Sequence, residues 1–188
     1  MRKAFLMAVA MVLGVAVAAP AEVTSGPQVG AQVGAFTVTK VAGNPDDGVE
    51  AGKSLCYRCK MGARPVVMVF ARTADAKLAK LLKKLEEEVA EHESDKLTGF
   101  VNMIGGDADS LKKQAAEFVK SNDIKRIAFV VPEDAKNGPE DFKIAPDADL
   151  TVVCYKGGTV KANHAFSKGQ LDDAKIEAIV KASCSLVE

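Results

Sequence analysis

The chain has 188 residues, of which 48% are hydrophobic, and its 25 Lys and Arg residues balance 25 Asp and Glu residues. This length and hydrophobic content suit one globular domain with a single core. The balanced charge lacks the basic excess of a nucleic-acid-binding protein, so we expect no nucleic-acid partner. Beyond the first 21 residues, no apolar run approaches the roughly 18 residues that span a bilayer, and we expect no membrane span in the mature chain.

The first 21 residues have the pattern of a removable signal peptide. Arg2 and Lys3 give a positive start, residues 4–19 are apolar, and Ala19-Pro20-Ala21 has the small-x-small pattern of a cleavage site. An uncleaved anchor is the alternative, which the richness in Ala and Gly and the small-residue boundary disfavour. We therefore expect an extracytoplasmic protein, periplasmic or secreted, that is cleaved near Ala21.

Residues 22–34 show no periodicity and contain Gly26, Pro27, Gly30 and Gly34, which predicts a flexible lead-in to a domain over residues 35–188. Within the domain, β-branched and apolar patterns predict strands at 36–41, 65–72, 99–104, 126–131, 150–155 and 159–166. Helical spacing of apolar residues predicts three helices, one that starts at Thr73 or Asp75 and includes Leu78 to Val89, one at 109–121 and one at 170–183. The last two strands form a hairpin around Gly157-Gly158. This order predicts a single α/β domain.

The stretch from Phe142 to Val180 resembles the second half of thioredoxins. Residues 150–160 (LTVVCYKGGTV) and 167–171 (SKGQL) follow that family's strand, Lys-x-Gly turn, strand and start of the final helix. Residues 66–72 match its central strand, and residues 36–38 with 52–55 look like the extra N-terminal hairpin of the peroxiredoxin and envelope-thioredoxin branches. The resemblance implies a thioredoxin-like three-layer sandwich, a mixed central sheet with helices on both faces.

The sequence departs from that family at its usual active site. Thioredoxins carry Trp-Cys-x-x-Cys between the central strand and the next helix, where the helix N-terminus stabilises a thiolate. Here the matching segment, Thr73-Ala74-Asp75-Ala76-Lys77, contains no cysteine, and Leu150 stands before Thr151 where the family has a cis-proline. A peroxiredoxin-type peroxidatic cysteine with its upstream Thr and Pro is also missing. The family's mechanism therefore cannot be transferred residue by residue.

The chemistry that remains is centred on Cys56-Tyr57-Arg58-Cys59-Lys60, in an irregular stretch of more than 20 residues before the strand at 65–72. Loops of this length in compact domains are often functional. Two cysteines at this spacing can close a small disulfide ring, and the cations of Arg58, Lys60 and Arg64 favour a thiolate nearby. One interpretation is thiol–disulfide exchange with an envelope redox partner or client protein, in which one cysteine attacks and the other resolves the mixed disulfide.

Two other interpretations of the pair stay open. The pair precedes a strand, and the residues from Met61 to Pro65 show no helical pattern, so we expect no helix N-terminus to activate a thiolate. The cysteines then form a permanent staple in a non-catalytic binding or scaffold module of the same fold. In the third interpretation the pair holds a metal or haem. Structural zinc needs four ligands, however, and no second Cys-x-x-Cys or adjacent histidine supplies them, so we expect no cofactor and no metal.

The remaining cysteines and histidines give weaker expectations. Cys184 follows the last helix at the spacing of its inward face, and in a thioredoxin-like sheet this helix runs back along the strand that holds Cys154, which predicts a Cys154–Cys184 disulfide. Two buried free thiols are the alternative. His92 is expected at the surface, and His164 either faces solvent or completes a site.

Overall fold

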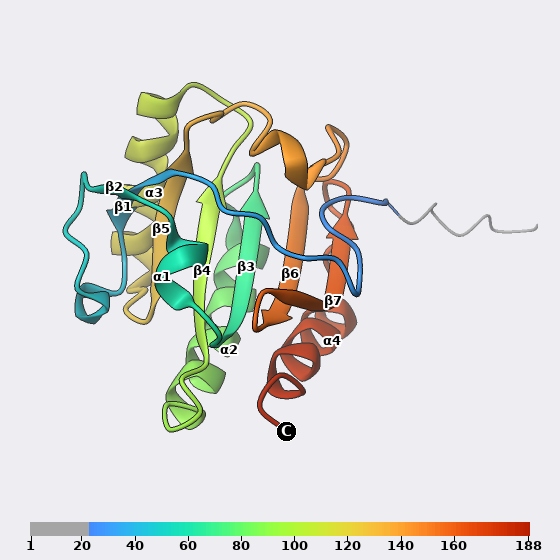
Figure 1. The fold of residues 1–188 in the computed structure, drawn as a ribbon. Coiled ribbons are helices and arrows are strands. Elements are labelled where there is room, and N and C mark those ends of the chain that lie inside the picture. Colours follow the sequence, from blue (N-terminus) through green and yellow to red (C-terminus); the bar gives the residue numbers. More distant parts are fainter. Residues whose placement is uncertain (1–22) are drawn as a thin grey trace, which may run out of the picture.

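The computed structural model describes residues 23–188, which form a seven-stranded mixed sheet (Figure 1). The strand order is β2-β1-β5-β4-β3-β6-β7, in which β3, β4 and β5 run parallel and the other neighbours antiparallel. The strands are β1 (Val38–Ala42), β2 (Ser54–Leu55), β3 (Pro65–Ala71), β4 (Thr98–Met103), β5 (Ile127–Pro132), β6 (Leu150–Lys156) and β7 (Thr159–Phe166). The expected leader lies outside the described residues.

Four α-helices connect or follow these strands: α1 (Tyr57–Met61), α2 (Ala76–Glu91), α3 (Ala108–Asn122) and α4 (Asp173–Cys184). Each of the three long helices begins after an aspartate whose carboxylate accepts hydrogen bonds from the first turn, namely Asp75, Asp107 and Asp172. Two short 3-10 helices, η1 (Pro45–Asp47) and η2 (Glu140–Phe142), lie in the loops. None of the helices in residues 23–188 is long and apolar enough to cross a membrane.

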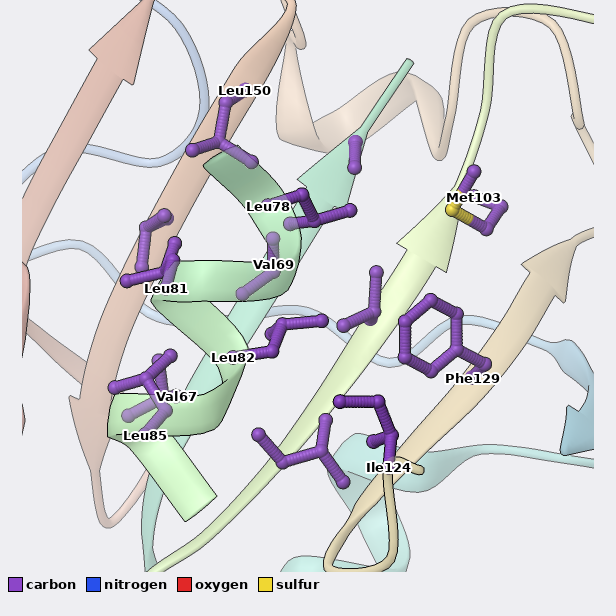
Figure 2. Close-up of a cluster of buried hydrophobic side chains, with 14 of the residues drawn as sticks. Val67, Val69, Leu78, Leu81, Leu82, Leu85, Met103, Ile124, Phe129 and Leu150 are labelled. Atoms are coloured by element: carbon purple, nitrogen blue, oxygen red, sulfur yellow. The ribbon is translucent and has the colours of Figure 1, made fainter. Parts of the chain in front are cut away.

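The three long helices cover one face of the sheet. All seven residues of β3 are buried, and successive side chains point to opposite faces. Val67 and Val69 point toward the leucines of α2, which follow one another at helical spacing (Figure 2). This packing puts α2, α3 and α4 over one core, to which they contribute Leu78, Leu81, Leu82, Leu85, Leu111, Ala115, Phe118, Ile176 and Ile179.

The other face of the sheet carries α1, η2 and the N-terminal segment. Val66, Met68 and Phe70 of β3 point into this second core. Tyr57 and Met61 pack onto it from α1, and Figure 1 shows α1 and the N-terminal segment crossing this face. The predicted mixed sheet with helices on both faces is confirmed, although only short helices cover the second face.

Residues 23–34 pack against the β6–β7 hairpin, whereas the sequence predicts a flexible lead-in there. The Ser25 hydroxyl is buried and bonds the Thr151 hydroxyl at 2.7 Å, and the Asn163 side-chain amide donates to the carbonyls of Ser25 and Pro27. The Val33 N–H donates to the Gly158 carbonyl at 2.7 Å. Glycines break the periodicity of this segment, but its side chains and backbone still bind the sheet edge.

Candidate functional site

The cysteine pair begins helix α1. Cys56 is the N-cap residue, its sulfur accepts a hydrogen bond from the Cys59 N–H at 3.0 Å, and a disulfide joins the two residues. Gly62 ends the helix with φ +59°, a conformation that favours glycine, and its N–H donates to the Arg58 carbonyl. The prediction that the pair lies outside any helix is therefore wrong, because one short turn forms without an apolar period.

The two cysteine residues differ in exposure. Cys59 is exposed, whereas Cys56, the N-cap residue of α1, is half-buried. A thiol from solvent therefore reaches the Cys59 side of the disulfide more readily. The Cys56 sulfur already accepts an N–H bond, and such a bond stabilises a thiolate at that atom.

A buried ion pair and a tyrosine anchor α1. Tyr57 is fully buried and its hydroxyl donates to Asp47 Oδ2 at 2.5 Å, while Lys40 Nζ binds Asp47 Oδ1 at 2.7 Å. The Lys40 ammonium also donates to the carbonyls of Asn44 and Val49, which satisfies its protons. Burial, followed by the bond to Asp47 and its charge, raises the pKa of Tyr57, so the phenol stays protonated and keeps donating.

This anchor was not predicted from the sequence. One signal was present: Lys40 shares the inward side of its strand with Val38, an unusual place for an unpaired lysine. The Tyr57 ring also stacks on Phe100 of β4, with ring centroids 5.3 Å apart. The anchor thus couples the position of the disulfide to the central sheet.

The three cationic side chains that were expected to favour a thiolate, those of Arg58, Lys60 and Arg64, occupy different places. Arg58 Nε donates to the Val33 carbonyl at 3.0 Å, and its guanidinium lies against Gly158, where a Cβ would collide with it. Lys60 and Arg64 are exposed and line a groove of about 790 Å³ together with Lys96. Lys60, Arg64 and Lys96 form no ion pair within residues 23–188, but the carboxylates of Asp46 and Glu93 line the same groove, so it carries charges of both signs.

Comparison with solved structures identifies the fold. A protein of Chlorobium tepidum assigned as the thiol:disulfide interchange protein DsbE matches 86% of this chain and 99% of its own at 13% identity and a TM-score of 0.62. A protein of Bacteroides thetaiotaomicron assigned as a protein disulfide isomerase matches 88% and 94% at 14% identity and 0.62. Mycobacterium tuberculosis AhpC matches 86% and 99% at 12% identity and 0.56.

The chain has a thioredoxin-like fold. No family model matches the sequence, and no curated protein is similar enough to count as a relative. At identities this low, the similarity shows the fold alone, and the chemistry has to be argued from the residues of this chain.

The usual active-site position of the thioredoxin-like fold has a different chemistry here. After β3, the Thr73 hydroxyl donates to Asp149 at 2.6 Å, and the Asp75 carboxylate accepts the N–H groups of Lys77 and Leu78. These groups satisfy one another and cap α2. The cysteine pair instead precedes β3 in the chain and begins α1, which packs on the opposite face of the sheet from α2.

The predicted Cys154–Cys184 disulfide is absent, and both residues are free thiols. Cys154 is buried in the middle of β6, where desolvation raises its pKa to about 12. Cys184 ends α4 on the side that faces α2, and its thiol donates to Glu88 Oε2 at 2.9 Å. The prediction placed α4 along β6, but its last turn instead contacts the neighbouring helix.

His164 lies on β7 beside a cavity of about 370 Å³ that the N-terminal segment partly covers. Its Nε2 atom is buried and has no hydrogen-bond partner within residues 23–188. Desolvation lowers the pKa of His164, so the ring favours its neutral form. Neither Cys56 nor Cys59 lines this cavity, and we assign His164 no part in thiol chemistry.

Proposed function

We propose that this protein is an exported thiol–disulfide oxidoreductase that reacts through Cys56 and Cys59. The observation that carries the proposal is the disulfide at the start of α1, with an exposed Cys59 and a Cys56 sulfur that accepts a backbone N–H. Structural neighbours whose names denote disulfide interchange and isomerase proteins support thiol redox chemistry on this fold.

The exchange begins when a client thiolate attacks the sulfur of the exposed residue Cys59. The bond between the two protein sulfurs breaks, a mixed disulfide forms at Cys59, and the electron pair leaves on Cys56 as a thiolate. The N–H bond at Cys56 lowers the free energy of this leaving group. A second client thiolate then attacks the client's sulfur and releases Cys59, so the client loses two electrons and the protein gains two.

The test is the reduction potential of the pair, measured in the purified protein by glutathione and dithiothreitol titration with thiol labelling and mass detection. We expect a value between roughly −120 and −270 mV, the range of thiol-exchange proteins. A Cys154→Ser variant should give the same value, since that thiol is separate from the pair. Reduction only below about −300 mV, or only on unfolding, would contradict the proposal.

The second candidate function is a non-catalytic binding or scaffold module. The observation that favours it is the cysteine-free segment Thr73–Lys77 at the fold's usual active site. In that case the Cys56–Cys59 disulfide only orders the loop. The expected result of the titration is then that the disulfide is reduced only below about −300 mV, or only on unfolding.

Export is the part of the proposal that rests on the first 21 residues. The full-length chain, expressed in a bacterium with an envelope, should appear in the extracytoplasmic fraction with an intact mass that lacks the residues up to about Ala21. The partner is then an envelope redox protein or client. Full-length mass in the cytoplasmic fraction would remove export from the proposal and leave the thiol chemistry untouched.

A further inference from the structure

Helices α2 and α4 bring three metal-binding side chains together at their C-terminal ends. Glu88 and His92 are four residues apart at the end of α2, so they share one face of the helix. Cys184 is the last residue of α4. The two helices pack against each other, and ion pairs between Lys80 and Asp173 and between Lys84 and Glu177 hold them side by side.

The distances suit a single ion. One ligand atom from each of Glu88, His92 and Cys184 lies within 4.8 Å of the other two. The Cys184 sulfur is 2.9 Å from Glu88 Oε2, which is 3.8 Å from His92 Nε2. A tetrahedral zinc site with bonds of about 2.0–2.3 Å separates its ligands by roughly 3.3–3.8 Å, so side-chain shifts below about 1 Å would complete it.

A second observation concerns the other nitrogen of His92. Its Nδ1 atom lies 3.4 Å from Asp95 Oδ2, while Nε2 faces Glu88. A histidine that binds a metal commonly donates its remaining N–H to a carboxylate, which fixes the ring and its tautomer. The Glu88 and His92 side chains keep 18% and 30% exposure, so an ion can reach them from solvent.

We propose that Glu88, His92 and Cys184 bind one Zn²⁺ ion, with the fourth position open to water. A carboxylate oxygen, an imidazole nitrogen and a thiolate sulfur are all zinc ligands, and three protein ligands plus water is the composition of an open zinc site. Binding replaces the proton of the Cys184 thiol, which passes to solvent, and the ion cross-links α2 to α4. The proposal is independent of the chemistry at Cys56 and Cys59.

The test uses the purified protein with its Cys56–Cys59 disulfide intact, so that those sulfurs cannot bind metal. Calorimetric titration with Zn²⁺ should give one equivalent, and Co²⁺ should give a thiolate-to-metal charge-transfer band. Ca²⁺ and Mg²⁺ prefer oxygen ligands and should not compete. The zinc complex should also melt at a higher temperature than the free protein.

Variants of the three ligands separate this site from adventitious binding. Cys184→Ser should abolish the Co²⁺ charge-transfer band, and His92→Gln should weaken Zn²⁺ binding at least about tenfold. The matched controls Cys154→Ser and His164→Gln should bind as the unchanged protein does. Circular dichroism checks that each variant folds. One-equivalent binding that survives Cys184→Ser, or no saturable binding by the folded unchanged protein, would overturn the proposal.

Discussion

Cys59 is exposed and Cys56 is half-buried, so their single variants should react differently with an alkylating reagent. Cys56→Ser leaves the exposed Cys59 thiol, which should be modified on the order of tenfold faster than the half-buried Cys56 thiol left by Cys59→Ser. Stopped-flow labelling with a maleimide measures both rates, and a Cys184→Ser background removes the more accessible of the two other free thiols, since Cys154 is buried. Equal rates would contradict the assignment of Cys59 as the attacked sulfur.

The Tyr57 hydroxyl is expected to stabilise the fold through Asp47. Tyr57→Phe removes a bond to a buried charged carboxylate and should lower the free energy of unfolding by about 1.5–3 kcal/mol in urea titration. Tyr155→Phe is the matched control, since the Tyr155 hydroxyl is buried without a partner in the described part of the chain. That variant should be neutral or stabilising, because it removes an unsatisfied polar group. Equal losses in both would show that the Asp47 bond contributes nothing specific.

His164 should make stability depend on pH. Desolvation lowers its pKa in the folded state below the ordinary value of about 6.5, so the unfolded chain binds the proton more tightly. The stability that neutral His164 allows is fully present above about pH 6.5. It is lost as the pH falls through the lowered pKa of the folded state. Urea midpoints at about pH 7.5 and pH 5 should therefore differ less in His164→Gln than in the unchanged protein. An identical difference in both would contradict this origin.

The sequence predicted individual residues where a local pattern identified them. The Cys56–Cys59 pair stood out as the only closely spaced cysteines. The Lys40–Asp47–Tyr57 network could not be predicted in the same way, because it joins residues of a strand, a loop and a helix. The predicted disulfide of Cys184 was wrong for a related reason. Helical spacing indicates that Cys184 lies on the inward side of its helix, but it does not indicate whether a strand or another helix contacts that side.

Among the elements, the N-terminal segment gives the clearest stability test. Ser25→Ala removes the bond to Thr151 and the acceptor of the Ala145 N–H, both in buried or half-buried surroundings. We expect a loss of about 1–3 kcal/mol in the free energy of unfolding, measured in urea. Ser54→Ala removes an exposed hydroxyl pair with Thr39 and should stay within about 0.5 kcal/mol. A Ser25→Ala variant as stable as this control would mean that the segment is loosely held.

The long helices and the central strands were predictable because each has its own local pattern. Asp75 caps α2 directly before a run of leucines at helical spacing, and β3 is an unbroken apolar run. Helix α1 has only five residues, and contacts with Asp47 and Phe100 hold it. An isolated helix of this length is unstable in water, so no local sequence pattern predicts it.

The whole molecule is organised around β3, which lies between two cores and pairs with a strand on each side. We expect its amides and those of β4 to exchange hydrogen most slowly, since they open only with the global unfolding of the domain. Peptide-resolved hydrogen exchange by mass spectrometry measures this order. The short edge strand β2 should exchange fastest of the strands. Protection of β2 equal to that of β3 would contradict the two-core description.

The thioredoxin-like class and the chain order of the long elements could be predicted, but the distribution of the helices over the two faces could not. β3 is apolar on both faces, so its sequence does not indicate which face receives the long helices. The three long helices lie together over one core, and the chain before β3 covers the other.

The cysteine pair precedes the N-terminal end of β3, and the fold's usual active-site segment follows its C-terminal end. Helix α1 packs on one face of the sheet and α2 on the other, so the disulfide and the start of α2 belong to different faces. Covering the face that carries α1 would therefore leave the face that carries α2 open.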